Sequence, residues 1–312
     1  MLRLLKLFAC AVFLVHHPHS AWAQSGFSVV KQADRLLISL ENSAVAQYVF
    51  NDPKILRPYF SSLCLTSGLQ VTRNHPPVEG KDATDHDAMH PGLWLGFGDI
   101  NGQDYWRNKA NMRHVRFLAE PDCQNDKLSF ATQCELQTAK GKPQCRMTNR
   151  YTLTSRPEGW LLVWEATFHA DFETVVLGDQ EEMGLGARVA TAITEKNGGR
   201  IVNSNGLYSA KQTWGQAADW CDYSGKIDGK PVGITLMASR SNFRESWWHN
   251  RDYGVFVANP FGRKAMNQGP LSEVTIDQGQ SLTLRFGVLV HGKLDSDLAT
   301  ISQAFDRFYT QQ

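Results

Sequence analysis

The strongest constraint on the fold is an alternation of apolar and polar side chains along much of the chain. In residues 281–290 (SLTLRFGVLV), apolar side chains stand at every second position from Leu282 to Val290. Successive side chains of a β-strand point to opposite faces, so this pattern predicts a strand with one buried face. Residues 146–153 and 160–168 are interpreted as further strands, joined by the turn residues 156–159 (RPEG).

Short turn signals connect these strands. Residues 274–276 are expected to form a hairpin with residues 281–290 across the turn DQGQ at 277–280, and residues 226–237 are expected to form another around DGK at 228–230. No long helical stretch separates the strands, which favours antiparallel sheets.

One helix is predicted at the C-terminus. Its apolar stripe has helical spacing and consists of Leu294, Leu298, Ile301, Phe305 and Phe308. Asp295 or Ser296 is available as the N-cap. The predicted fold is therefore all-β, a large antiparallel β-sandwich with a C-terminal α-helix that closes one edge or face.

The N-terminal residues have the pattern of an export signal. Arg3 and Lys6 precede an apolar run over residues 7–15, and residues 21–23 (AWA) form a small-x-small cleavage site. The apolar run is too short to span a membrane. We expect residues 1–23 to be a signal peptide removed near Ala23, residues 24–312 to be a single β-sandwich domain, and the mature protein to be periplasmic or secreted, without stable membrane insertion.

Charge and motif content exclude several functions. Without the signal peptide, 30 basic and 31 acidic residues remain, which does not favour a nucleic-acid partner. Glycine-rich dinucleotide and phosphate loops and the Gly-x-Ser-x-Gly elbow are absent. We therefore expect no cofactor, and the oligomeric state stays open.

The mature chain has five cysteines, at positions 64, 123, 134, 145 and 221. Cys134 and Cys145 flank a turn at residues 139–141 symmetrically, so a cross-strand disulfide is one interpretation. Buried free thiols that act as small apolar side chains are the other.

Two segments combine aromatic, charged and glycine residues in a way that a plain core strand does not need. Residues 85–106 (DHDAMHPGLWLGFGDINGQDYW) contain two histidines and four aspartates, and residues 247–262 (WWHNRDYGVFVANPFG) have the same character. Sugar sites require flat apolar surfaces together with fixed donors and acceptors. We expect the two segments to converge on one concave surface.

Several motifs resemble the PmoA-like family of bacterial proteins. They include residues 57–60 (RPYF), 73–77 (RNHPP), 90–94 (HPGLW), 182–184 (EMG), 222–225 (DYSG) and 251–254 (RDYG). The resemblance implies a β-sandwich associated with bacterial sugar catabolism, distantly like the galactose-mutarotase supersandwich, and not a methane oxygenase. Family members often carry more histidines before Gly-Leu-Trp, where this chain has residues 87–89 (DAM).

The histidines of the two segments are the candidate proton-transfer groups. His86 and His90 are four residues apart, which on a helix would suit a metal pair, but Pro91 and Gly92 favour a loop. The alternatives are a catalytic or substrate-binding role, a metal site and a structural role, and we predict no metal. His249, near Asp252, is the second candidate, with a surface ion pair as its alternative.

The acids and arginines complete the prediction. Glu182 and Asp222 are the candidate partner acids or bases, and Arg188 and Arg251 are expected to stabilise negative charge, whereas a solvated acid and a salt-bridged arginine are the alternatives. Substrate contacts are assigned to His86, Trp94, Asp99, Trp106, Trp248 and Tyr253, whereas Trp160, Trp164 and His291 are assigned to the structure.

The predicted function is acid–base catalysis on a sugar or glycoside by an exported protein, through epimerisation, elimination or hydrolysis. The alternatives are a non-catalytic carbohydrate-binding or scaffold β-sandwich and an extracellular protein-interaction domain.

Overall fold

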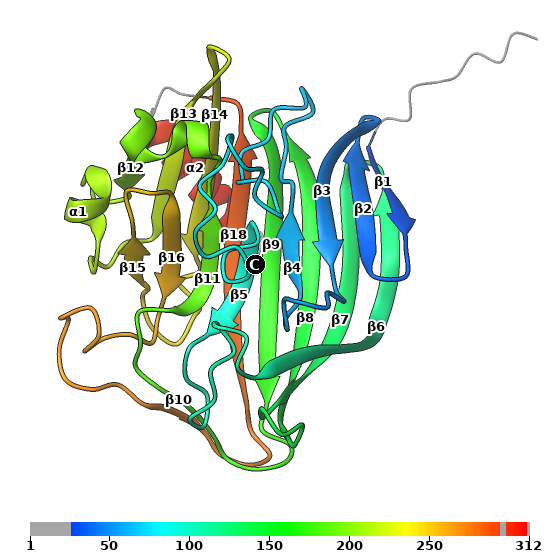
Figure 1. Cartoon of the computed structure of the whole chain (residues 1–312), viewed down its shortest axis with the longest axis vertical. Helices are drawn as coiled ribbons and strands as arrows, with labels where there is room; N and C mark the ends of the chain where they lie inside the picture. Colours follow the sequence, from blue (N-terminus) through cyan, green and yellow to red (C-terminus); the bar gives the residue numbers. More distant parts are fainter. Residues whose placement is uncertain (1–25, 294–297, 311–312) are drawn as a thin grey trace, which may run out of the picture.

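The computed structural model describes residues 26–293 and 298–310, so the predicted signal peptide lies outside the described residues. Within them, two eight-stranded antiparallel sheets face each other (Figure 1). The front sheet has the order β1-β2-β3-β4-β5-β11-β16-β15, and the back sheet has the order β12-β13-β14-β18-β9-β8-β7-β6. The predicted antiparallel β-sandwich is confirmed.

The elements have the following bounds. The front sheet consists of β1 (Phe27–Lys31), β2 (Arg35–Leu40), β3 (Ser43–Val49), β4 (Tyr59–Ser61), β5 (Leu93–Phe97), β11 (Met183–Arg188), β15 (Trp247–Asn250) and β16 (Val255–Asn259). The back sheet consists of β6 (Asn111–Gln124), β7 (Lys127–Gln137), β8 (Pro143–Arg156), β9 (Gly159–His169), β12 (Arg200–Asn203), β13 (Trp220–Ile227), β14 (Lys230–Ala238) and β18 (Ser281–His291). The other elements are β10 (Val175–Leu177), β17 (Val274–Ile276), η1 (Thr191–Ile193), η2 (Glu195–Asn197), α1 (Ser209–Thr213) and α2 (Leu298–Thr310).

The main core lies between the two sheets. The alternating residues Leu284, Phe286, Val288 and Val290 of β18 point into it, as their period of two predicts. Trp160 and Trp164 of β9 also lie there, as expected. Because each apolar side chain removed from water contributes roughly 1.5–3 kcal/mol, this layer is the main source of stability.

The C-terminal helix α2 covers the outer face of the back sheet, which confirms the predicted helix and its role. Ile301, Phe305 and Phe308 from its apolar stripe pack against Trp220 and Leu289. The proposed N-cap residues 295 and 296 lie outside the described residues.

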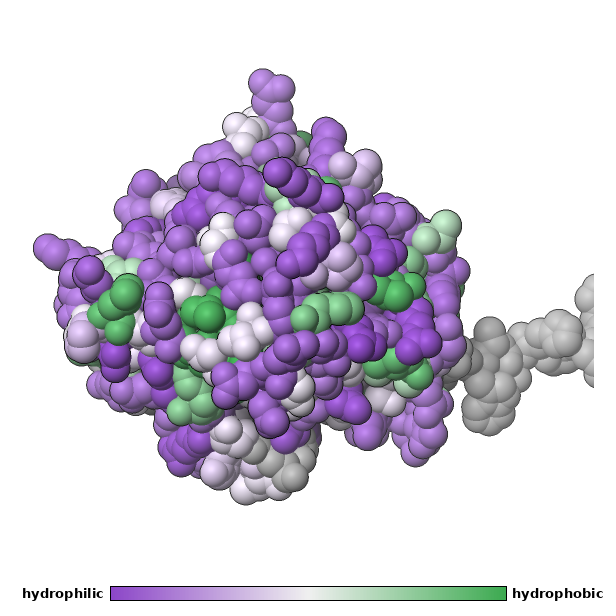
Figure 2. Space-filling model, turned by 90° about the horizontal axis from the view of Figure 1, so that it is seen from below, coloured by the Kyte–Doolittle hydropathy of each residue, from purple (hydrophilic) through white to green (hydrophobic). Residues whose placement is uncertain are grey.

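The surface seen in Figure 2 is mostly hydrophilic, and its hydrophobic side chains lie apart from one another.

One of the two predicted hairpins differs from the structure. The hairpin around residues 228–229 forms as expected, with Ile227 opposite Lys230. However, β17 pairs with β10 and not with β18, so the hairpin predicted across residues 277–280 is wrong. A turn sequence indicates a reversal of the chain, but the partner of a short strand depends on which edge lies nearby.

The cysteines are free thiols wherever the structure describes them. An irregular register near Gln137 places Cys145 opposite Leu136 and Cys134 opposite Met147. Cys134 and Cys145 are therefore diagonal neighbours, and such pairs lie about 7–8 Å apart, beyond disulfide reach. Of the two interpretations, the cross-strand disulfide does not form, and that of buried free thiols holds for this pair.

Candidate functional site

The outer face of the front sheet brings the two polar segments together. Strand register places Trp94, Gly186, Val257 and His249 in one row across β5, β11, β16 and β15. With adjacent strands about 4.8 Å apart, the Cα atoms of Trp94 and His249 lie on the order of 14 Å apart. Residues from opposite halves of the chain therefore share this surface.

The floor of this surface consists of two buried tryptophans. Trp94 and Trp106 are at most 1 % exposed, and their rings meet edge to face with centroids 5.3 Å apart. They pack over Gly96 and Gly186, whose missing side chains leave the space that the indoles occupy. Because both rings are buried, they support neighbouring groups and do not present a free stacking surface for a ligand.

Replacing Gly186 with alanine is expected to destabilise the protein by about 1–3 kcal/mol, the usual cost of overpacking. The added Cβ would lie 2.9 Å from Cζ2 of Trp94 and 3.2 Å from Cη2 of Trp106, and neither buried ring has room to withdraw. Urea unfolding would measure the loss, and near-ultraviolet circular dichroism would report the displaced indoles. Unchanged stability with an unchanged spectrum would contradict the packing.

His90 lies on this floor at the end of a loop. The backbone N–H of His90 donates to the carbonyl of His86 at 2.9 Å, so a single helical turn brings the two imidazoles together, with centroids 5.1 Å apart. The His90 ring also stacks on Trp94, with centroids 5.1 Å apart and an angle of 14°. The spacing of four residues therefore brings the two imidazoles to the same side of this turn, as it would in a helix, although the segment is a loop.

The hydrogen bonding of His90 determines its tautomer. Nη1 of Arg188 lies 3.4 Å from Nδ1 of His90. A guanidinium can only donate, so Nδ1 accepts and the proton of the neutral ring resides on Nε2. Among the described residues, none forms a hydrogen bond with Nε2. His90 is therefore arranged to donate a hydrogen bond from Nε2.

His90 is held in its neutral form. Burial lowers its pKa well below the usual value, and the nearby positive charges of Arg188, Arg73 and Arg57 lower it further. This arrangement suits a neutral imidazole that donates a hydrogen bond, because protonation would add charge to a buried cationic region.

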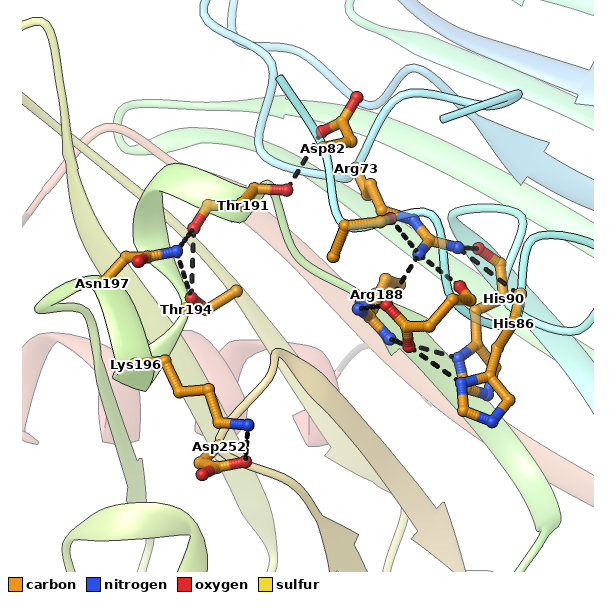
Figure 3. Close-up of polar contacts among 12 residues, drawn as sticks. Arg73, Asp82, His86, His90, Arg188, Thr191, Thr194, Lys196, Asn197 and Asp252 are labelled. Atoms are coloured by element: carbon orange, nitrogen blue, oxygen red, sulfur yellow. Dashed lines mark hydrogen bonds and ion pairs between the residues drawn. The ribbon is translucent and has the colours of Figure 1, made fainter. Parts of the chain in front are cut away.

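A charged network anchors the loop that carries His90 (Figure 3). Arg188 is 1 % exposed and donates to both carboxylate oxygens of Asp85, at 2.9 and 3.0 Å. Arg73, also buried, donates to the carbonyls of Ala83 and Asp85 at 2.8 and 2.7 Å. Nη1 of Arg73 also lies 3.7 Å from Oδ1 of Asp85, so the two buried guanidinium groups share the carboxylate of Asp85.

His86 and Tyr253 surround this network. Nδ1 of His86 lies 2.8 Å from Asp85, and its ring stacks on Tyr253 with centroids 6.3 Å apart. The guanidinium of Arg188 lies 4.6 Å from the centre of the Tyr253 ring, a cation–π contact. Burial alone would raise the pKa of Asp85, but Arg188 and His86 lower it below the usual range, so the carboxyl is ionised.

Stability is expected to fall as the pH is lowered from 7 to 5. Burial lowers the pKa of His75, His90 and His114, that of His114 to about 4, against about 6.5 in an unfolded chain. At pH values between the folded-state and unfolded-state pKa of such a group, the unfolded chain binds a proton that the folded protein does not bind. Each group therefore contributes a loss of up to about 1.4 kcal/mol per pH unit.

Urea unfolding at pH 7, 6 and 5 measures this dependence. In a His90→Gln variant, the slope of stability against pH should be shallower by the contribution of one proton. A stability that stays constant or rises towards pH 5 would show that these imidazoles are not held neutral.

His249 forms the second part of the site. It is 4 % exposed, and its Nδ1 lies 2.9 Å from Oε2 of Glu181. The N–H direction at Nδ1 is not aimed at this oxygen, so the contact is close but not a well-formed hydrogen bond. Nη2 of Arg251 donates to the same oxygen at 2.7 Å. The contacts with His249 and Arg251 lower the pKa of Glu181 despite its partial burial.

Glu181 was not among the predicted site residues. Its neighbour Glu182 was predicted from the sequence, but Oε2 of Glu182 accepts a hydrogen bond from Arg107 at 2.6 Å. Arg107 also bonds Asp104, at 3.2 Å. Both glutamates precede β11, and no sequence signal tells which of them faces His249.

Asn259 holds the segment that carries Glu181. Its Nδ2 donates to the carbonyls of Gln180 and Glu181, at 2.7 and 3.0 Å. Its Oδ1 accepts from the backbone N–H groups of Phe261 and Gly262. This buried amide therefore fixes the base of the loop on β16.

Other predicted residues lie elsewhere. Trp248 points into the core between the sheets, where its Nε1 donates to the carbonyl of Ala218 at 2.9 Å, so it does not face this surface. Asp99 follows β5, and its Oδ1 accepts from the backbone N–H of Gly102 at 2.9 Å, which stabilises a turn.

Asp222 lies on the opposite side of the molecule, on the outer face of the back sheet beside α2. Its carboxylate contacts His291 at 2.8 Å and accepts from the hydroxyls of Thr235 and Ser224 at 2.7 and 2.8 Å. Burial opposes ionisation, but these partners lower the pKa of Asp222 overall. The structure thus separates Asp222 from His90 and His249 and joins it to His291, which was assigned a structural role.

Residues 35–306 match a family of unknown function, DUF6807. The chain belongs to this family. The PmoA-like assignment suggested by the motifs is therefore wrong, because the family found is DUF6807 and nothing indicates a PmoA-like one. No curated protein matches the chain.

Several solved structures are similar to this DUF6807 member. A galactose mutarotase-like protein from Lactobacillus casei is 9 % identical, with a TM-score of 0.37, over 85 % of this chain and 100 % of the other. A galactose mutarotase-like protein from Clostridium acetobutylicum is 9 % identical, with a TM-score of 0.42, over 86 % and 98 %. A heparan sulfate lyase from Pedobacter heparinus is 8 % identical, with a TM-score of 0.41, over 88 % of this chain and only 36 % of the lyase.

Two further features concern the described residues of the DUF6807 chain. No group of three or more His, Cys, Asp or Glu side chains among them is arranged to hold a metal ion. In the same residues, no helix has the length and apolar character needed to cross a membrane.

Proposed function

We propose that this protein is an exported carbohydrate-active enzyme that moves protons on a sugar bound at the outer face of the front sheet. The single observation that supports this most is the shared row of Trp94 and His249, which places two histidines of different hydrogen-bonding character on one surface. Proton-transfer reactions of sugars require an acceptor and a donor on either side of the reacting atoms.

His249 is the proton acceptor in this proposal. The carboxylate of Glu181, 2.9 Å from Nδ1, favours the tautomer with a proton on Nδ1, which leaves the lone pair of Nε2 for a substrate. The imperfect direction of the Nδ1 contact is common in enzymes without substrate and tightens when substrate binds. Glu181 also stabilises the imidazolium that forms when His249 takes a proton.

His90 is the hydrogen-bond donor. Because its Nδ1 accepts from Arg188 and its pKa is lowered, it acts through the proton on Nε2 without becoming charged. A neutral imidazole in this position polarises a carbonyl or stabilises a developing oxyanion. The role differs from the proton-transfer role expected from the sequence.

The charges around the site distinguish among sugar reactions. Among the described residues, the three buried arginines Arg57, Arg73 and Arg188 have one carboxylate within ion-pair distance, that of Asp85, and it pairs with Arg73 and Arg188 but not with Arg57. Positive surroundings favour an anionic transition state, as in epimerisation, elimination or ring opening. Glycoside hydrolysis passes through an oxocarbenium-like cation, which such surroundings disfavour. We therefore infer an isomerase or lyase in preference to a hydrolase.

Sugars in D₂O provide the test. Proton NMR of glucose, galactose, galacturonate and their disaccharides, incubated with the protein, would report anomeric exchange and deuterium uptake at ring carbons, and ultraviolet absorbance would report an unsaturated product. We expect one of these changes, at a rate proportional to protein concentration. Saturable binding without chemistry would instead identify a carbohydrate-binding sandwich, and absence of binding would exclude a sugar site for this set.

Export is part of the same proposal. The basic residues Arg3 and Lys6, the apolar run over residues 7–15 and the small residues around the Ala23 cleavage site support it. N-terminal sequencing of the protein recovered from a periplasmic or culture fraction should read from Gln24. An intact N-terminus in the cytoplasmic fraction would contradict export.

A further inference from the structure

A pocket lies beside the candidate site, between α1 and the end of β15. Its volume is about 450 Å³, and its polar and aromatic lining consists of Glu195, Lys211, Trp214, Asn250, Arg251 and Asp252. Pockets for small ligands typically measure about 300–1,000 Å³, so this one has room for a sugar ring. None of the reactions considered above uses it.

Arg251 lies between this pocket and the candidate site. Its guanidinium donates to Glu181 at 2.7 Å on one side and lies 5.9 Å from the centre of the Trp214 ring on the other. Glu181 in turn contacts His249 at 2.9 Å. The pocket is therefore adjacent to the Glu181–His249 pair. A ligand longer than one sugar ring that is bound at His249 can reach into it.

The lining has the chemistry of a sugar subsite. Trp214 is partly exposed and provides a flat apolar surface for the C–H face of a pyranose. Lys211 and Arg251 are able to donate hydrogen bonds to a ligand and Glu195 and Asp252 are able to accept them, so opposite charges balance around the pocket. A neutral, hydroxyl-rich ring matches this lining better than a lone anion or an apolar ligand.

Two polar atoms of the lining lack partners. Among the described residues, Nε1 of Trp214 and Oδ1 of Asn250 are buried without a hydrogen bond, although Nδ2 of Asn250 donates to Thr213 at 2.8 Å. Unpartnered buried groups are uncommon in folded proteins and require an explanation. One is a donor and the other an acceptor, and a hydroxyl group can serve either after a small rotation of these side chains.

We propose that this pocket binds a second sugar ring, next to the ring that reacts at His249, so that the ligand is a disaccharide or longer glycoside. This inference rests on the proposed function, because it assumes that a sugar lies over His249. It adds that Trp214 and Arg251 select ligand length, which the reacting groups do not.

Binding of sugars of increasing length tests the inference. The dissociation constants of glucose, maltose and maltotriose, and of galacturonate, digalacturonate and trigalacturonate, are measured by NMR titration of the mature protein. In at least one series, the disaccharide should bind about tenfold more tightly than the monosaccharide, the effect of one aromatic platform. Trp214→Ala should abolish this gain and leave monosaccharide binding unchanged, whereas Trp214→Phe should retain most of it.

Tyr208→Ala is the matched control. Tyr208 is an exposed aromatic residue adjacent to α1 that does not line the pocket, and its replacement should leave both dissociation constants unchanged. Monosaccharide binding without a gain for the disaccharide, or a gain that survives in Trp214→Ala, would overturn the subsite and leave the proposed function standing. If no sugar of either series binds, both proposals fail.

Discussion

Replacing His249 with glutamine is expected to lower turnover of a sugar substrate by about 10²- to 10⁴-fold, the usual contribution of a positioned acid–base group. Glutamine has a similar volume and can still contact Glu181, but it cannot accept the substrate proton. The free energy of unfolding should therefore change by less than about 1 kcal/mol. The NMR exchange assay measures the rate, and urea unfolding measures the stability.

The two neighbouring glutamates provide a matched comparison. Glu181→Gln should lower turnover by a smaller factor than His249→Gln, because it removes the group that orients the imidazole and stabilises its charged form. Glu182→Gln should keep most of the turnover, since that carboxylate pairs with Arg107 and not with His249. Equal losses in the two glutamate variants, or full activity in His249→Gln, would reject His249 as the base.

Replacing Asp85 with asparagine is expected to destabilise the protein by about 2–3 kcal/mol. Asp85 is the carboxylate shared by Arg73 and Arg188, whose side chains are 0 % and 1 % exposed. Removing one partner of a buried ion pair leaves uncompensated charge and costs about 3–5 kcal/mol. The smaller value is expected here because the Asp85 side chain is 39 % exposed, so water screens part of the interaction.

Asp87→Asn is the control for this experiment. Asp87 belongs to the same loop, but in the part of the chain that the structure describes its side chain forms a hydrogen bond only with the backbone N–H of Ala88, so its replacement should change stability by less than about 0.5 kcal/mol. If Asp85→Asn is as mild as Asp87→Asn, the two arginines do not depend on the shared carboxylate.

The strands and the terminal helix could be predicted because their signals are local. The period of two in residues 281–290 became the inward face of β18, and the helical stripe of Ile301, Phe305 and Phe308 became the buried face of α2. Such patterns depend only on which side of an element meets the core. The pairing of β17 with β10 was missed because it depends on where two distant short strands come to lie.

The candidate site was predicted in part. Both histidine segments were expected to meet, and register places Trp94, on which His90 stacks, in one row with His249. The face to which a strand residue points was harder to assign. Trp248 and His249 are adjacent in β15, so one must point into the core and the other outward, and a shift of one residue exchanges them.

The sequence by itself determined the strand-rich architecture, the C-terminal helix and the two segments in which polar and aromatic residues concentrate, because each of these follows from the spacing of side chains along a local element. Only the tertiary structure decided that Glu181 and not Glu182 meets His249, that burial and the nearby Arg188 hold His90 neutral, and that Asp222 belongs to the far side of the sandwich with His291. These outcomes depend on strand register and on charges distant in sequence, which act through space and leave no pattern along the chain.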